Sequence, residues 1–225
     1  MELYCTLLCS AGLYLQYDGA GLLVDALNGP WAPYKQLPDE TAARILAGEN
    51  GFAGARGAVF THRHPDHCRE SLAEAFLRAH PGAQCFLPDE RTPESLTLEI
   101  GPFTVECRSF VHTPIPYALV PHYVLYVTAG EKSVYITADA APDCARHRAI
   151  LAGRRADAAF WNGQYLSYPE TRQLMAEAAR QNYIYHLPED PHNGVRRKCE
   201  RNFARCAGEL TTVSALTDYP TSLKI

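Results

Sequence analysis

Long apolar stretches, linker segments and internal repeats are all missing from this chain of 225 residues. No stretch approaches the roughly 20 apolar residues that a transmembrane helix needs, so we expect no membrane association. No Ser/Gly tract, charge block or low-complexity segment divides the sequence, which predicts a single domain over residues 1–225. Residues Met1–Cys9 lack a basic start and a cleavage site, so they are expected to form a first strand rather than a signal peptide. These absences favour a cytoplasmic globular protein.

Strong charge and paired cysteines are missing as well. The formal net charge is −4, which argues against broad electrostatic binding to nucleic acid or to a membrane. We therefore expect a small-molecule substrate and no specific nucleic-acid partner. The eight cysteines form no C-x-x-C pair, and a chain of this size does not need disulfides, so free and mostly buried thiols are expected. The oligomeric state stays open.

A dense cluster of metal-binding residue types is what the chain does have. His62, His64, Asp66 and His67 fall within six residues, directly after a short apolar run. A strand that carries His62 and His64 two residues apart places both side chains on the same side, and the next turn can aim Asp66 and His67 at a second position. Imidazole and carboxylate are ligands of borderline and hard divalent metals, and burying them unpaired is costly. The pattern therefore predicts a metal site.

Short apolar runs elsewhere in the chain also stop on a polar residue. The runs end at Asp25, His62, Asp139, Asn162 and His186. An apolar run of four to eight residues is typical of a buried strand, and ligands gather where buried strands end. The repetition predicts one shared edge that carries chemistry.

In this order, these residues resemble the signature of the metallo-β-lactamase superfamily. The resemblance implies an α/β fold, namely a four-layer αββα sandwich with two mixed β-sheets, with one or two metals at one edge of the sheets. It also implies a ligand set, in which a first metal takes two motif histidines and a later histidine, a second metal takes Asp66 and two further histidines, and one aspartate bridges. The implied metal ligands are His62, His64, Asp66, His67, His112, Asp139 and His186.

Two site assignments leave alternatives. His112 and His122 both lie where the later histidine is expected, and we prefer His112 because it follows the strand that begins at Phe103. His122 would then touch substrate or donate a proton to the leaving group, unless it is only a hydrogen-bonded histidine at a strand end. Asp25 would either orient a ligand histidine through a hydrogen bond or serve as a turn residue.

The ligand set predicts the reaction class better than the substrate. Two divalent ions, Zn²⁺ by default with Mn²⁺ or Fe²⁺ as alternatives, can lower the pKa of a shared water to near neutral. The resulting hydroxide would attack an electrophile, and Asp66 would orient or deprotonate this nucleophile. His64 stands where di-iron relatives that reduce oxygen or nitric oxide usually carry a carboxylate, which favours a hydrolase.

The spacing after the third histidine resembles the branch that contains ribonuclease Z and the cyclic phosphodiesterase of phosphonate metabolism. However, Ser10-Ala11-Gly12 replaces the Gly-Thr pair that is usual in the first turn of that branch, and the arm that grips tRNA is missing. We therefore expect a small phosphodiester or cyclic phosphate as the substrate. A thioesterase, a lactonase and a non-catalytic metal-binding protein are the alternatives.

The helical periodicity predicts helices over residues 39–49, 68–80, 142–153, 169–181 and 193–207. The last of these carries a run of basic residues, Arg196, Arg197, Lys198, Arg201 and Arg205. Because Val195, Cys199 and Cys206 give that helix an apolar side, we expect the basic run on its solvated face, with phosphate steering as the alternative. His80 and His147 carry no motif and are expected at the surface.

Overall fold

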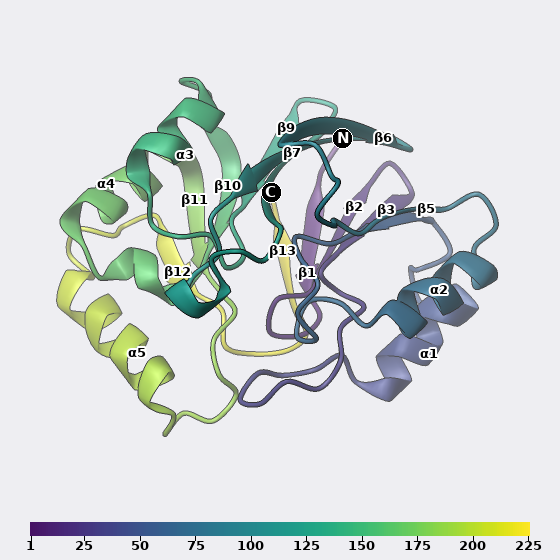
Figure 1. The fold of residues 1–225 in the computed structure, drawn as a ribbon, viewed down its shortest axis with the longest axis horizontal. Coiled ribbons are helices and arrows are strands. Elements are labelled where there is room, and N and C mark those ends of the chain that lie inside the picture. Colours follow the sequence, from purple (N-terminus) through teal and green to yellow (C-terminus); the bar gives the residue numbers. More distant parts are fainter.

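The chain folds into two mixed β-sheets that pack face to face (Figure 1). The computed structural model describes residues 1–225. The first sheet has the strand order β13-β1-β2-β3-β4-β5, with β1 (Tyr4–Leu7), β2 (Leu13–Tyr17), β3 (Ala20–Val24), β4 (Ala55–Val59), β5 (Gln84–Phe86) and β13 (Thr221–Lys224). The second has the order β12-β11-β10-β9-β8-β7-β6, with β6 (Ser95–Ile100), β7 (Phe103–Phe110), β8 (His122–Ala129), β9 (Lys132–Ile136), β10 (Ala156–Trp161), β11 (Ala179–Ile184) and β12 (Val213–Ala215).

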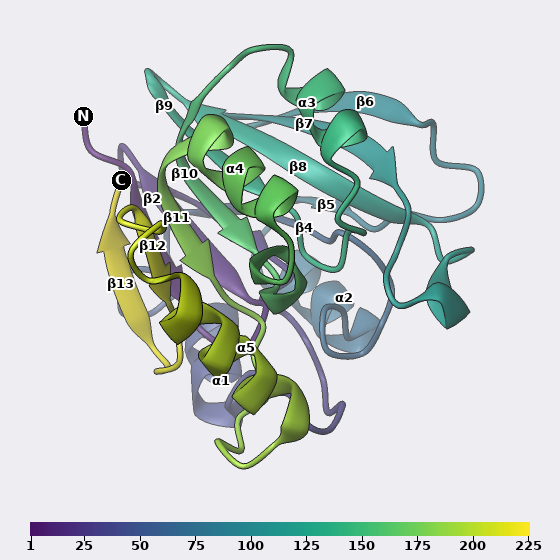
Figure 2. The same ribbon diagram turned by 90° about the vertical axis from the view of Figure 1, so that its left-hand side faces the viewer.

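Helices cover the outer face of each sheet, which confirms the expected αββα sandwich. The first sheet carries α1 (Asp39–Ala47) and α2 (Glu70–Ala79). The second carries α3 (Cys144–Leu151), α4 (Pro169–Ala178) and α5 (Gly194–Cys206), and Figure 2 shows α4 and α5 in front of this sheet. Two short 3-10 turns, η1 (Ile115–Tyr117) and η2 (Gly163–Leu166), follow β7 and β10. Each helix is too short or too polar to cross a lipid bilayer.

The apolar runs are continuous because both faces of these strands are buried. In β10, Phe160 packs between the sheets while the neighbouring Trp161 packs against the helices. In β3, Leu22 lies between the sheets and Leu23 contacts the layer of α1 and α2. Because side chains alternate between the two faces, a strand buried on both sides must be apolar at nearly every position.

Parallel pairing brings the strand ends to one edge. Strand β3 pairs parallel with β4, and β10 pairs parallel with both β9 and β11. Parallel neighbours end at the same edge of a sheet, so the segments after β3 and β4 emerge at one edge of the first sheet and those after β9, β10 and β11 at one edge of the second. The two edges adjoin, because His62 Nε2, after β4, lies 3.8 Å from Asp139 Oδ2, after β9. The expectation of a shared edge is confirmed, and it places Asp25, His62, Asp139, Asn162 and His186 near one another.

Some element boundaries differ from the prediction. The helix expected over 169–181 ends at Ala178, because residues 179–181 pair with β10 as the start of β11. Strands β12 and β13 were not predicted, since they are short and their sequences, VSA and TSLK, are partly polar. They form by adding edges to β11 and β1, which is a tertiary effect that local sequence does not encode.

Candidate metal centre

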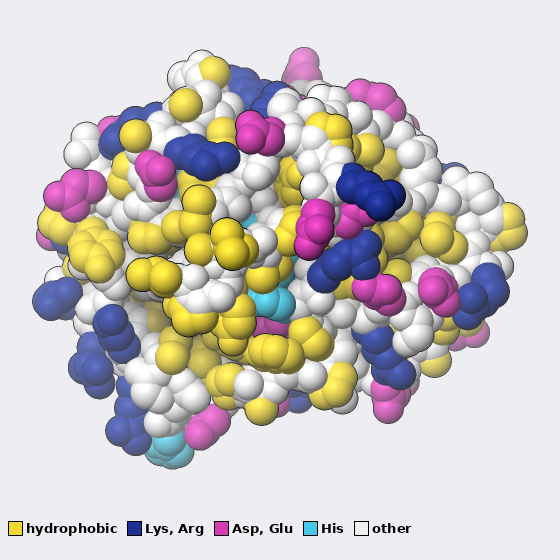
Figure 3. Space-filling model, viewed as in Figure 1, with side chains coloured by type: hydrophobic (Ala, Val, Ile, Leu, Met, Phe, Trp, Pro, Cys, Tyr) yellow, Lys and Arg dark blue, Asp and Glu magenta, His cyan; other side chains and the backbone are white.

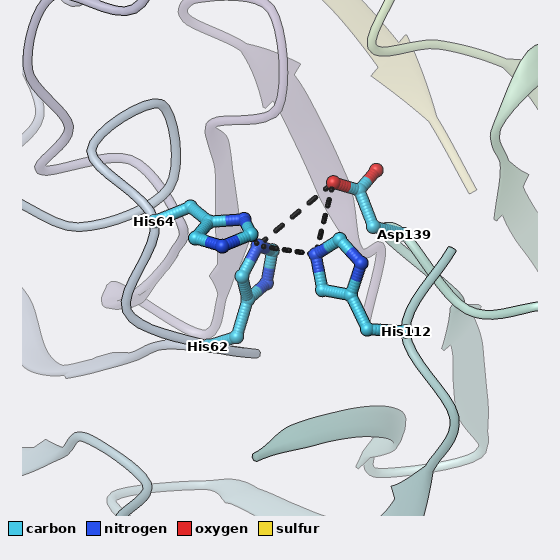
Figure 4. Close-up of side chains that lie close together, drawn as sticks. All are labelled: His62, His64, His112 and Asp139. Carbon is cyan, nitrogen blue, oxygen red and sulfur yellow. Dashed lines mark hydrogen bonds and ion pairs between the residues drawn. The ribbon is translucent and has the colours of Figure 1, made fainter. Parts of the chain in front are cut away.

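Seven side chains of metal-binding type converge at the edge where strands of both sheets end. His62, His64, His112 and Asp139 form a first group, shown in Figure 4, and Asp66, His67 and His186 form a second group. Within each group the ligand atoms lie within 4.8 Å of one another. The structure thus brings together all seven residues that the sequence proposed as metal ligands.

A tight turn separates the two halves of the histidine motif. The backbone N–H groups of His67 and Cys68 both donate to the His64 carbonyl, at 2.9 and 2.8 Å. The Asn28 side chain holds the same turn by donating from Nδ2 to the Asp66 carbonyl at 2.8 Å. The turn directs His64 to the first group and the next residues, Asp66 and His67, to the second group.

Ring nitrogens of the first group face one another at short range. His62 Nε2 lies 3.1 Å from His112 Nε2 and 3.2 Å from His64 Nδ1. Asp139 approaches the same point, with its Oδ2 atom 3.5 Å from His112 Nε2 and 3.8 Å from His62 Nε2. Several lone pairs that point at one small volume repel each other unless a cation lies between them. The arrangement therefore fits a divalent metal ion.

Asp25 orients two of the histidines from behind. Its Oδ2 atom accepts hydrogen bonds from His67 Nδ1 at 2.9 Å and from the Thr61 hydroxyl at 2.8 Å. Because Thr61 donates its proton to Asp25, its oxygen accepts from His62 Nδ1 at 3.0 Å. Both rings then keep a proton on Nδ1 and direct Nε2 at the two groups. Sequence reasoning missed Thr61, although a hydroxyl directly before the first motif histidine was the available signal.

Strained backbone holds several of these residues. Asp25, Ala138 and His186 have positive φ angles of 50°, 44° and 55°. Non-glycine residues rarely adopt this left-handed conformation, and its concentration at one site indicates that the surrounding structure imposes it. Asn162 restrains the segment around Asp139, because its Nδ2 donates to the Ala138 carbonyl at 2.8 Å and to the Ala140 carbonyl at 3.2 Å.

The two groups differ in how they hold protons. Burial lowers the pKa of His62 well below its usual value and the pKa of His112 to about 4, so these rings are neutral near pH 7. Burial alone would also lower the pKa of His67, but the carboxylates of Asp25 and Asp66 raise it well above its usual value. Asp139 likewise raises the pKa of His186 against the effect of burial. Without metal, the second group therefore keeps protons that the first has lost.

We expect a metal in the second group to dissociate first on acidification. A metal there must displace protons from His67 and His186, so its affinity falls as the pH decreases, whereas burial lowers the pKa of all three histidines of the first group, that of His112 to about 4. Metal content after dialysis in metal buffers between pH 8 and pH 5 should fall from two equivalents towards one. Loss of both ions in a single step, or retention of both at pH 5, would contradict this prediction.

The donor set consists of nitrogen and oxygen atoms only. Cys68, which follows the motif, packs in the core beside α1 and α2, and burial raises the pKa of its thiol to about 12. All eight cysteines are free, as expected, and none belongs to either group. Asp66 Oδ1 is buried without a hydrogen-bond partner, which leaves it available to a ligand. Nitrogen and oxygen donors of this kind fit zinc, manganese or iron.

A cavity of about 430 Å³ opens onto both groups and is lined by five of their seven side chains, namely His64, Asp66, His112, Asp139 and His186. Figure 3 shows histidine and acidic side chains in a hollow on this face, surrounded by hydrophobic side chains. Trp31 stacks on His64 with 5.8 Å between ring centroids, and Tyr34 stacks on His186 at 4.2 Å. Sequence reasoning did not find these aromatic walls, although two aromatic residues within Pro30-Trp31-Ala32-Pro33-Tyr34 were a visible signal.

His122 lies behind the first group rather than in the cavity. Its side chain is buried, and its ring centroid lies 5.1 Å from that of His62 and 5.3 Å from that of His112. Neither ring nitrogen has a hydrogen-bond partner, and the residue does not line the cavity. The role in substrate contact or proton donation that the sequence proposed for His122 therefore finds no support in its position. His112, by contrast, belongs to the first group.

The expectation that His147 lies at the surface is wrong. The side chain is fully buried, where the Tyr135 hydroxyl donates to His147 Nδ1 at 2.6 Å and His147 Nε2 donates to the Tyr165 hydroxyl. Tyr165 in turn donates to the Ala141 carbonyl at 2.9 Å. Burial lowers the pKa of His147 to about 3, so this network is neutral and supports the segment that follows Asp139.

No family model and no curated protein matches this chain by sequence. Solved structures match it over its whole length. The metallo-β-lactamase fold protein YhfI from Bacillus subtilis is 16% identical, with a TM-score of 0.68 and full coverage of both chains. A possible metal-dependent hydrolase from Veillonella parvula is 13% identical, with a TM-score of 0.65 and coverage of 100% of this chain and 99% of that one. CmlA, a diiron β-hydroxylase from Streptomyces venezuelae, is 12% identical with a TM-score of 0.60, and this chain corresponds to 54% of its length.

Three observations agree on one fold: the four layers, the position of the site at the strand ends, and the matches to solved structures. The protein has the metallo-β-lactamase fold. The fold resemblance first inferred from the histidine motif is confirmed.

Proposed function

We propose that the protein is a metal-dependent hydrolase that acts on a phosphodiester or a cyclic phosphate with two divalent ions, zinc in the first instance. The observation that carries this proposal is the convergence of seven residues with nitrogen and oxygen donors in two adjacent groups, five of which line a cavity large enough for a small molecule. The eight free cysteines agree with a reducing compartment such as the cytoplasm.

The residues of the site have distinct tasks. When bound, the two ions would lower the pKa of a water molecule and stabilise negative charge on the reacting group. Burial would raise the pKa of Asp66, but His67 and His186 hold it below its usual value, so Asp66 is ionised near pH 7. Asp66 lines the cavity and its Oδ1 atom has no hydrogen-bond partner, which suits it to accept a proton from the attacking water.

Hydrolysis is favoured over oxidation by the composition of the first group. The name of CmlA shows that a diiron hydroxylase can share this fold, so the fold alone does not select the chemistry. Here three neutral imidazoles and one carboxylate make up the first group, and His64 occupies the motif position where oxygen-reducing relatives usually carry a carboxylate. A thioester or lactone is the alternative substrate, because the same residues could act on either.

The first test is hydrolysis of bis(p-nitrophenyl) phosphate by zinc-loaded and manganese-loaded protein. We expect the wild type to turn over the diester and the activity of His64→Ala to be lower by at least about 100-fold. Removing a metal ligand should lower activity more than removing a residue that only hydrogen-bonds to a ligand. The fold of His64→Ala should be largely intact, since this side chain is only half-buried at the wall of the cavity. Bound metal should decrease in parallel with activity.

His192→Ala is the matched control, because it removes an exposed histidine that belongs to neither group. Turnover of thioesters or lactones but not of the diester would support the alternative substrate class. Full activity and unchanged metal content in His64→Ala would refute the site assignment. Failure of the wild type to take up metal would favour a non-enzymatic role.

A further inference from the structure

A second wall of the cavity carries polar side chains that belong to neither metal group. Gln164 lies in η2, Ser167 follows that turn, and Lys198 and Asn202 project from α5. Lys198 and Asn202 are four residues apart, so they occupy the same face of the helix. Segment η2 packs against α5, and Figure 2 shows α5 on the helical side of the second sheet.

The acceptor atoms of this wall are already engaged within the protein. Gln164 Oε1 accepts from the Thr113 hydroxyl at 3.2 Å, and Ser167 Oγ accepts from Asn202 Nδ2 at 3.3 Å. Asn202 Oδ1 accepts from Arg205 Nη2 at 3.2 Å. A primary amide carries two N–H donors and a hydroxyl carries one. The Gln164 amide group, one N–H of Asn202 and the Ser167 hydroxyl proton therefore remain to donate to a ligand.

Lys198 adds a positive charge to these donors. It is the one lysine or arginine among the residues that line the cavity, and it forms no ion pair, whereas the neighbouring Arg196 pairs with Glu200 at 2.9 Å. The two carboxylates in the cavity, Asp66 and Asp139, both belong to the metal groups. Lys198 is solvent-exposed, as expected for the basic run, and it also lines the cavity, which the sequence did not indicate.

We infer that Gln164, Ser167, Lys198 and Asn202 form an anion-binding subsite that holds a second oxyanion group, a phosphate or a carboxylate, of the substrate. An ammonium group that lines the same cavity as neutral donors suits an oxyanion, because charge-assisted hydrogen bonds are stronger than neutral ones. The subsite extends the proposed function, on which it rests for the reacting end of the substrate. It would select molecules that carry both a scissile bond and a separate negative charge.

Two chromogenic diesters test this subsite, namely thymidine 5′-(p-nitrophenyl phosphate) and the same compound with a 3′-phosphate. They share the scissile bond and the leaving group, so a difference in rate reports on the distal phosphate alone. Metal-loaded wild type should prefer the 3′-phosphorylated compound by about tenfold or more in kcat/KM, mainly through KM, as expected for a hydrogen bond between charged groups. Lys198→Met should abolish the preference.

Arg197→Met is the matched control, because it removes the same charge from an exposed position on α5 that does not line the cavity. It should keep the preference. Equal rates on the two diesters in the wild type, or a preference that survives in Lys198→Met, would overturn the subsite while leaving the hydrolase intact. A preference lost equally in both variants would also overturn it, because general charge attraction would then explain the effect.

A binding measurement separates failure of the subsite from failure of the proposed function. If neither diester is hydrolysed, the phosphodiesterase proposal is wrong, and thymidine 3′,5′-bisphosphate and thymidine 5′-phosphate are then titrated into metal-loaded protein by calorimetry. Tighter binding of the bisphosphate by wild type and Arg197→Met, but not by Lys198→Met, would support the subsite. Equal affinity for both nucleotides in the wild type would contradict it.

Discussion

Replacing Asp139 with asparagine is expected to abolish hydrolysis and to reduce bound metal from two equivalents to one or none. Asp139 is the residue whose carboxylate approaches both groups, with Oδ2 3.4 Å from His67 Nε2 and 3.5 Å from His112 Nε2. Its Oδ1 lies 3.5 Å from His186 Nε2. Asparagine keeps the shape of the side chain but removes the negative charge that would offset two bound cations. Loss of a residue that only hydrogen-bonds to a metal ligand lowers activity by up to about 100-fold. Asp139 is proposed as a ligand itself, so we expect kcat/KM to fall by more than this.

Metal content by elemental analysis and diester hydrolysis measured on the same preparation test this prediction. Asp218→Asn is the matched control, because it makes the same change at an exposed aspartate outside the site. The backbone around position 139 should be unaffected, since Asn162 fixes the carbonyls of Ala138 and Ala140 on either side. Two retained metal ions together with activity within tenfold of the wild type would show that Asp139 does not bridge.

The second large effect is expected from His112→Ala, which should lose metal from the first group, whereas His122→Ala should keep both ions. His112 Nε2 lies 3.1 Å from His62 Nε2 and 3.5 Å from Asp139 Oδ2. His122 belongs to neither group, does not line the cavity and forms no hydrogen bond. Removing its buried ring should mainly create a cavity, at a cost of about 2–5 kcal/mol in the free energy of unfolding.

The two variants therefore predict opposite patterns of metal content and stability. Metal content at saturation should fall only in His112→Ala, and the free energy of unfolding of the metal-free protein should fall more in His122→Ala. His122→Phe, which refills the space with an apolar ring, should recover part of that stability without changing the metal content. Loss of metal in His122→Ala with retention in His112→Ala would reverse the assignment of the third histidine.

Much of the site could be predicted because its residues follow strands in a regular way. The motif from His62 to His67 is local, and one strand and one tight turn suffice to divide it between two metal positions. Asp139 and His186 could be placed because each closes an apolar run buried on both faces. Parallel pairing of β9, β10 and β11 then forces these ends to the same edge.

The choice between His112 and His122 depended on packing rather than on sequence. Both flank the loop that contains η1, and both are buried. The backbone around His112 pairs with the segment after β9, with Thr113 N donating to the Asp139 carbonyl at 2.8 Å, and this contact draws His112 into the first group. A contact between residues so far apart in the chain leaves no local pattern.

By itself, the sequence placed the chemistry at strand ends and marked the motif from His62 to His67 as a metal site, because strand periodicity and motif spacing are local properties. The fold class and the complete set of seven candidate ligands followed from the resemblance to the metallo-β-lactamase signature. Only the tertiary structure decided which other side chains join them. Thr61 links Asp25 to His62 through hydrogen bonds, His147 is buried beneath the segment after Asp139, and Lys198 lines the cavity. The positions of these side chains depend on how the two sheets and α5 pack against one another. This packing is determined by residues from the whole chain and not by the local sequence around each side chain.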